Sequence, residues 1–360
     1  MAYSSIVKPG DYFNTITYSG DGTSPKSITG FNFQPDLVWT KTRTYANNHT
    51  LFDNVRGAGS NKELSSNSAS AEGGVATGTY GYLSSFDTDG FTATSGSSGI
   101  NYFNSSGDTY VNWGWLASNT TASNTDGSIT STVSANTTSG FSIVKFTGTG
   151  ANATVGHGLG AKPNVIILKS YENGQQWSSY WSVLGATKYM RFNATNGEST
   201  ASNRWNNTEP TTSVFTVSTD GEVNTNGENQ IAYCFAEKTG YSKFGSYTGN
   251  GSPDGPFIYT GFKPAFVMIK NTSATGTWIM KDVKRNPFNV ANTALGANNN
   301  ASEGDYNSSL NEIDILSNGF KLRDTYSDQN TSGNSYIYMA FAENPLVANS
   351  GTDGVPATAR

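Results

Sequence analysis

Charged side chains are scarce in this chain of 360 residues. Asp, Glu, Lys and Arg make up 14% of it, against about a quarter in a typical globular domain. Cysteine occurs once, at Cys234, which excludes an internal disulfide, and we expect this thiol to be a small buried apolar group. Histidine occurs only at His49 and His157, so few side chains could shuttle a proton near neutral pH.

Other absences exclude further classes of protein. The net charge is −5 and the basic residues are scattered, so no basic stripe is present to face phosphates and we expect no nucleic-acid binding. No apolar run approaches the length of a membrane-spanning helix, so we expect no membrane insertion. Residues 1–9 lack a basic segment followed by an apolar core, which predicts no signal peptide and synthesis in a cytoplasm.

Small polar residues and aromatic residues dominate what is present. This bias fits either a disordered chain or many short strands joined by polar turns. Disorder predicts few aromatic residues, whereas 12% of this chain is aromatic, with 7 Trp, 19 Tyr and 19 Phe. We therefore expect a folded all-β protein.

One strand-like motif, a Pro followed by an apolar run that ends in Lys, occurs three times. Its copies are Pro35–Lys41, Pro163–Lys169 and Pro264–Lys270. A Gly-containing turn precedes each copy, and a turn pair follows the Pro after about 54 to 57 residues. These pairs are Asp89-Gly90, Asp220-Gly221 and Asn318-Gly319, which we interpret as hairpin turns rather than calcium loops. An aromatic strand closes each unit, at Tyr110–Trp115, Gln230–Glu237 and Tyr336–Glu343.

These repeats predict three tandem antiparallel β-sandwich modules. We place them at residues 1–118, 128–238 and 239–345, followed by a polar C-terminal tail at 346–360. The run Leu37-Val38-Trp39 is too continuous for a strand that faces water on one side, so we expect it between two layers. A polar linker near residues 118–127 separates the first two modules.

The sequence contains no catalytic motif. A Ser-His-Asp or Cys-His arrangement would have to use one of the two histidines, both of which lie in turn-like segments. Many carboxylates are present, but no spacing singles out a pair for glycoside hydrolysis. We therefore predict no catalytic, cofactor-binding or metal-binding residues and no cofactor.

Three residues are candidates for ligand binding. Asp53 and Arg56, three positions apart, would form a structural ion pair that anchors a loop, or else hold a polar ligand such as a sugar. Trp205 lies in a polar stretch without a core pattern around it, so we expect an exposed ring that could stack on a sugar.

The strongest likeness to a known family lies in the first module. Phe33–Arg43, Leu51–Gly57, Asp89-Gly90-Phe91 and the closing Trp strand together resemble the repeated module of virion structural proteins from marine tailed phages, particularly those that infect cyanobacteria. The likeness extends over nearly the whole chain but is looser in the second and third modules. It implies a lectin-like or jelly-roll β-sandwich at the particle surface, and it supplies no catalytic residues.

We therefore expect a non-enzymatic structural protein of a tailed-phage virion, displayed as a tail fibre, a knob or a capsid decoration. Its expected partners are other virion proteins and further copies of itself, for which a trimer would cover sheet edges. The alternative is an adhesin that binds a host surface glycan. A polysaccharide depolymerase is the weakest of the three hypotheses.

Overall fold

The chain folds into antiparallel sheets joined by turns and very short helices. A computed structural model describes residue 4, residues 6–306 and residues 310–345. Strands account for 40% of the protein, and none of the sheets built from the described residues closes into a barrel. The prediction of an all-β protein is confirmed, while the tail predicted at 346–360 lies outside the described residues.

One order of four antiparallel strands occurs three times along the chain. We call these units repeats 1, 2 and 3, and their four-strand cores the inner sheets. In repeat 1 the order is β1 (Phe13–Ser19), β7 (Thr109–Trp115), β3 (Leu37–Thr42) and β4 (Thr50–Asp53). In repeat 2 it is β10 (Phe141–Thr147), β17 (Asn229–Phe235), β12 (Val165–Ser170) and β13 (Ser178–Trp181). In repeat 3 it is β18 (Ser242–Thr248), β25 (Ser335–Pro345), β20 (Phe262–Asn271) and β21 (Ile279–Asp282).

Smaller antiparallel ladders, here called outer sheets, accompany the inner sheets. They are β2 (Lys26–Thr29), β6 (Gly90–Thr94) and β5 (Tyr82–Asp87) in repeat 1, β11 (Ala153–Gly156) and β16 (Val214–Val217) in repeat 2, and β19 (Phe257–Tyr259), β24 (Gly319–Leu322) and β23 (Ile313–Leu316) in repeat 3. In each outer sheet, the strand that follows the first inner strand pairs with the last strand before the closing inner strand. These pairs are β2 with β6, β11 with β16, and β19 with β24. The recurrence therefore extends beyond the inner sheets.

The remaining elements extend or connect these sheets. Five further strands lengthen the inner sheets of repeats 2 and 3: β8 (Ala122–Asn124), β9 (Ser131–Asn136), β14 (Lys188–Arg191), β15 (Ser199–Thr200) and β22 (Leu295–Gly296). The helices are η1 (Pro9–Asp11), α1 (Thr77–Tyr80), α2 (Ser202–Trp205), α3 (Gly221–Asn224) and η2 (Glu303–Tyr306). Strand β8 lies in the segment predicted as a linker, which is therefore partly an edge strand.

The repeated strands are buried on both faces. In β3, Leu37 and Trp39 point into a cluster shared by all three repeats, whereas Val38 between them packs inside repeat 1. The alternation follows from the period of two of a strand, which sends neighbouring side chains to opposite faces. The expectation that this run does not face water on either side is confirmed.

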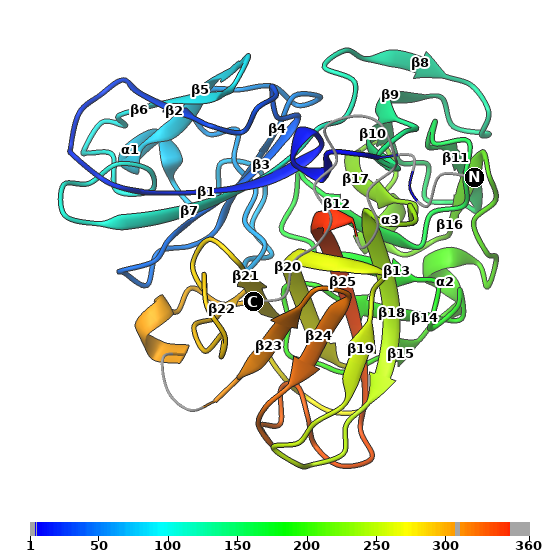
Figure 1. The fold of residues 1–360 in the computed structure, drawn as a ribbon. Coiled ribbons are helices and arrows are strands. Elements are labelled where there is room, and N and C mark those ends of the chain that lie inside the picture. Colours follow the sequence, from blue (N-terminus) through cyan, green and yellow to red (C-terminus); the bar gives the residue numbers. More distant parts are fainter. Residues whose placement is uncertain (1–3, 5, 307–309, 346–360) are drawn as a thin grey trace.

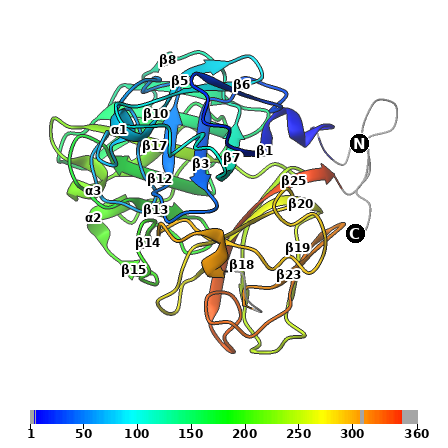
Figure 2. The same ribbon diagram turned by 90° about the vertical axis from the view of Figure 1, so that its left-hand side faces the viewer.

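One large apolar cluster, which we call the common core, joins the three repeats. Inner-sheet side chains from each repeat meet there, among them Trp113 and Trp115, Tyr233 and Phe235, and Met339 and Phe341. Three separate clusters each contain side chains from the inner and the outer sheet of one repeat. The repeats form three lobes around the common core, coloured blue to cyan, green, and yellow to red (Figure 1). The lobe of repeat 3 stays distinct when the molecule is turned by 90° (Figure 2).

The turn pairs fall into two groups. Residues 88–89 join β5 to β6 and residues 317–318 join β23 to β24, so the hairpin prediction is confirmed in repeats 1 and 3. In repeat 2 it is wrong, because Asp220 is the N-cap of α3 and its Oδ1 accepts a hydrogen bond from Glu222 N at 2.9 Å. In repeat 2 the position equivalent to Asp89 is occupied by Ser213. The carbonyl of Ser213 accepts a hydrogen bond from His157 N, just as the carbonyl of Asp89 accepts one from Gly30 N.

Candidate functional site

Trp205 is buried, so its predicted exposure is wrong. Its side chain is 2% exposed and packs in the cluster inside repeat 2, edge-on to the ring of Tyr180. The ring belongs to the one-turn helix α2, which turns it inward although the flanking residues are polar. Trp205 is therefore a core residue and cannot stack on a sugar from solvent.

Asp53 and Arg56 form a buried ion pair. Arg56 Nε lies 2.6 Å from Asp53 Oδ2, and both side chains are 1% exposed or less. The guanidinium also donates to Glu72 Oε1 at 2.9 Å and to Lys62 O at 2.8 Å. The hydroxyl of Tyr233, on β17 of repeat 2, donates to the same Asp53 oxygen at 2.9 Å. The pair therefore joins repeat 1 to repeat 2 and has no surface from which to hold a sugar.

The same arrangement occurs in repeat 3. Arg285 donates to Asp282 and to Glu303, and the Nε1 of Trp113 donates to Asp282 Oδ2 at 3.2 Å. Trp113 occupies in β7 the register position that Tyr233 occupies in β17. In repeat 2 the position of the Asp is taken by Trp181, which is part of the common core. Two of the three equivalent positions are therefore occupied by buried ion pairs and the third by an apolar ring.

Both histidines and the cysteine are held in structural contacts. His49 accepts from Trp39 Nε1 at 2.8 Å through Nδ1, while its Nε2 lies 3.0 Å from Gly296 O in repeat 3. This pattern places the proton on Nε2, and burial holds the pKa of His49 well below its usual range. His157 Nδ1 accepts from Leu159 N at 3.2 Å. Cys234 is fully buried as expected, and burial raises the pKa of its thiol.

The lysine that ends each repeated strand is buried, not solvent-exposed. Lys41, Lys169 and Lys270 are each 0% exposed. Their ammonium groups donate to backbone carbonyls, and two reach the preceding repeat: Lys169 Nζ lies 3.0 Å from Ala69 O, and Lys270 Nζ lies 2.9 Å from Thr195 O. Burial lowers the pKa of Lys169 and of Lys270 to about 8. Lys169 and Lys270 therefore connect successive repeats through hydrogen bonds.

Each repeat contains a buried asparagine that was not predicted from the sequence. Asn104, Asn224 and Asn330 are 0% exposed and use both ends of the amide. In each case Oδ1 accepts a backbone N–H of the loop after the first inner strand, and Nδ2 donates to a carbonyl two residues later in that loop. The available signal was the spacing of this Asn three residues before a Gly, which occurs in all three repeats.

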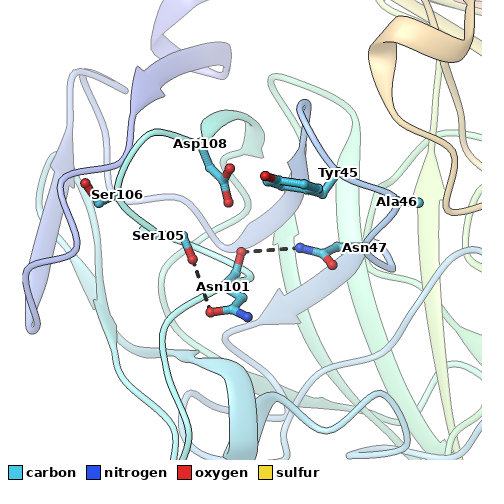
Figure 3. Close-up of a pocket in the computed structure, with 7 residues that line it drawn as sticks. All are labelled: Tyr45, Ala46, Asn47, Asn101, Ser105, Ser106 and Asp108. Atoms are coloured by element: carbon cyan, nitrogen blue, oxygen red, sulfur yellow. Dashed lines mark hydrogen bonds between the residues drawn. The ribbon is translucent and has the colours of Figure 1, made fainter.

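An open polar pocket lies on repeat 1. It has a volume of about 570 Å³ and is lined by Tyr45, Ala46, Asn47, Asn101, Ser105, Ser106 and Asp108. One wall is the loop between β3 and β4, and the other is the loop between β6 and β7. The ring of Tyr45 is 61% exposed, and its hydroxyl is directed toward the side of Asp108 (Figure 3). None of these residues was predicted as a site, because the two loops are more than 50 residues apart in sequence.

Hydrogen bonds fix the two walls of this pocket to one another. Asn47 Nδ2 donates to Asn101 O at 3.5 Å, and Ser105 Oγ donates to Asn101 Oδ1 at 3.1 Å (Figure 3). The hydroxyl of Thr44 donates to Asp108 Oδ1 at 3.2 Å. The pocket is therefore held in shape by hydrogen bonds, and its lining offers an exposed aromatic ring, amides, hydroxyls and one carboxylate.

No group of three or more His, Cys, Asp and Glu side chains in residues 4, 6–306 and 310–345 is arranged to hold a metal ion. In the same part of the chain, no helix has the length and hydropathy of a membrane span.

The fold and these sites define an all-β chain in which one sheet order occurs three times around a common core. Residues 8–345 match the model of the family described as Domain of unknown function (DUF7483), so the chain belongs to that family. A search of curated proteins and a search of solved structures each found no match.

Proposed function

We propose that this chain is a non-enzymatic structural protein of a tailed-phage virion, built from three tandem β-sandwich modules and displayed on the particle as a tail fibre, a knob or a capsid decoration. Each module consists of one inner and one outer sheet with its own apolar cluster between them. The observation that carries the proposal is the threefold occurrence of the inner-sheet order around the common core.

Rigidity is the property that supports a structural role. The common core, the buried ion pairs and the buried lysines join the repeats through contacts that would have to break together for one repeat to move. Both histidines and Cys234 are used in packing and hydrogen bonds. The likeness to marine phage virion modules agrees with this role, as do other virion proteins and further copies of the chain as partners.

A carbohydrate-binding adhesin is the second candidate, and the pocket at Tyr45 favours it. An exposed aromatic ring beside amides and a carboxylate offers both a stacking face and hydrogen-bonding groups to a sugar. The two proposals are compatible, because a displayed virion protein can also bind the host surface.

Particle composition tests the structural proposal. Tailed-phage particles from cells that produce this chain would be purified through a density gradient and analysed by quantitative mass spectrometry. We expect the chain at many copies per particle, and a cryo-electron map should contain its three-lobed shape at the surface. Absence of the chain from purified particles, with other virion proteins present, would overturn the proposal.

A further inference from the structure

The three repeats place the same pair of loops at equivalent positions, so their loops can be compared residue by residue. The backbone N–H two residues after each buried lysine donates to the carbonyl of the first residue of the closing strand: Arg43 to Thr109, Tyr171 to Asn229 and Thr272 to Ser335, at 2.8, 3.3 and 2.9 Å. Two residues further along lie Tyr45, Asn173 and Ala274. The exposed tyrosine is therefore a feature of repeat 1 alone.

Repeat 2 fills the equivalent position with its own side chains. Asn173 Nδ2 donates to Glu228 Oε1, and Ser170 Oγ donates to Glu228 Oε2 at 2.9 Å. Glu228 is the equivalent of Asp108, because Gly148 N donates to Glu228 O as Gly20 N donates to Asp108 O. Its carboxylate is thus used within the loop pair. Repeat 3 has the methyl group of Ala274 in place of an aromatic ring.

Hydrogen bonds from Lys41 and from repeat 3 fix the loop that carries Tyr45. Lys41 Nζ donates to Tyr45 O at 2.9 Å, and Asn300 Nδ2 of repeat 3 donates to Ala46 O at 3.1 Å. Across the pocket, Tyr110 OH donates to Asn101 O at 2.9 Å. A ligand would therefore meet a preformed surface and would lose little free energy in ordering it.

The lining contains both donors and acceptors but no cation. The amide of Asn47 uses its Nδ2 and that of Asn101 its Oδ1 within the protein. In the described part of the chain, no hydrogen bond uses Asn47 Oδ1 or Asn101 Nδ2, so this acceptor and this donor remain available to solvent or to a ligand. Neighbouring sugar hydroxyls each donate and accept, which suits such a combination. The carboxylate of Asp108 adds a charged acceptor.

We propose that this pocket binds a neutral saccharide, with the apolar face of one sugar ring stacked on Tyr45 and two of its hydroxyls hydrogen-bonded to Asn47, Asn101 and Asp108. The inference rests on the adhesin proposed above and names its ligand class. An acidic sugar is disfavoured because Asp108 would repel it and no Lys or Arg side chain lines the pocket. A quaternary ammonium ligand is bound best by a cage of several aromatic rings, whereas this pocket has one.

Binding to a defined panel tests this assignment. The full chain would be titrated by calorimetry and by saturation-transfer NMR with cellotetraose, maltotetraose and chitotetraose as neutral probes, tetragalacturonate as the acidic probe and choline as the cationic probe. We expect at least one neutral probe to bind, and Tyr45→Ala to weaken it about tenfold or more through loss of the stacking face. Tyr45→Phe keeps the ring and should retain most of the affinity.

A matched variant and a folding measurement complete the design. Asn173→Ala alters the equivalent loop of repeat 2 and should leave binding unchanged. The unfolding temperature of Tyr45→Ala should stay at the wild-type value, because the ring is exposed. Absence of binding by every neutral probe, tighter binding of tetragalacturonate or choline, or equal affinities of wild type and Tyr45→Ala would each overturn the inference. The particle composition experiment is independent, so a failure here leaves the structural proposal standing.

Discussion

Removing the guanidinium of Arg56 should destabilise the protein far more than removing an exposed charge. Arg56 donates to Asp53 Oδ2 at 2.6 Å, to Glu72 Oε1 at 2.9 Å, to Lys62 O at 2.8 Å and to Leu51 O at 3.2 Å. In Arg56→Met the Asp53 carboxylate stays fully buried but loses its counter-charge. Breaking a buried pair in this way costs about 3–5 kcal/mol of unfolding free energy.

A double-mutant cycle separates the pair from the loss of packing. Asn at position 53 carries no charge, so the variant with both Asp53→Asn and Arg56→Met has no uncompensated buried charge. We expect the double variant to be more stable than the sum of the two single changes predicts, by about 1.5 kcal/mol or more. The measurement is the midpoint of urea unfolding, followed by tryptophan fluorescence and converted to free energy with the slope of each variant.

Two control variants show what a buried and an exposed ion pair each contribute to stability. Arg285→Met removes the equivalent cation in repeat 3 and should cost a similar amount, since its pair with Asp282 is equally buried. Lys162→Met breaks a pair with Glu209 in which both side chains are 45% exposed, and should cost less than about 1 kcal/mol. If Arg56→Met cost no more than Lys162→Met, the argument that this pair holds repeat 1 against repeat 2 would be refuted.

Three further predictions concern other buried groups. Burial lowers the pKa of His49, so below about pH 6.5 the unfolded chain binds a proton that the folded chain does not. The free energy of unfolding should therefore fall on acidification, by up to about 1.4 kcal/mol per pH unit. Burial raises the pKa of Asp36 to about 6, which has the opposite effect on stability, and this effect is the same in wild type and variant. Urea unfolding at pH 7.5, 6.5 and 5.5 should therefore give a smaller loss for His49→Gln, and equal losses would contradict the assignment. Asn224→Ala leaves the partners of a fully used buried amide unpaired and should lower the unfolding free energy by about 2–4 kcal/mol, whereas a change below 0.5 kcal/mol would count against it. Trp205→Ala should cost about 3–5 kcal/mol through the cavity it leaves and should not change saccharide binding, the reverse of what a surface platform would give.

Much of the strand pattern could be predicted from the sequence. The repeated Pro-to-Lys motif corresponds to β3, β12 and β20, and the aromatic closing segments correspond to β7, β17 and β25. These segments are rich in β-branched and aromatic residues and are bounded by turn residues, so local pattern and final structure agree. The continuous apolar character of Leu37-Val38-Trp39 also indicated burial on both faces correctly.

The parts that could not be predicted depend on contacts between distant segments. A sequence pattern says that a strand has two apolar faces, but not that the second face meets the other two repeats in a common core. Trp205 was placed at the surface because its neighbours in sequence are polar, while its contacts come from β13 and the rest of repeat 2. The repeated motif ends in a lysine, but nothing in the motif indicates that Lys169 and Lys270 each donate to a backbone carbonyl of the preceding repeat.

The site was the least predictable part of all. Tyr45 lies in an unremarkable polar loop, and its partners across the pocket follow about 60 residues later in the chain. The repeated Pro-to-Lys motif aligns Tyr45 with Asn173 and Ala274, four residues after the lysine in each repeat, and the backbone pairing agrees. A comparison by turn pairs alone would have misaligned repeat 2, where Asp220 caps a helix.

The joining of three copies within one polypeptide has a consequence for how new recognition can arise. In a ring of three identical subunits, one mutation alters every copy of a loop at once, including copies whose neighbours do not tolerate it. Here each copy is encoded separately, so a loop on one lobe is free to acquire a tyrosine while its two counterparts keep an asparagine and an alanine. Covalent linkage thus lets a near-symmetric scaffold present a single specialised face.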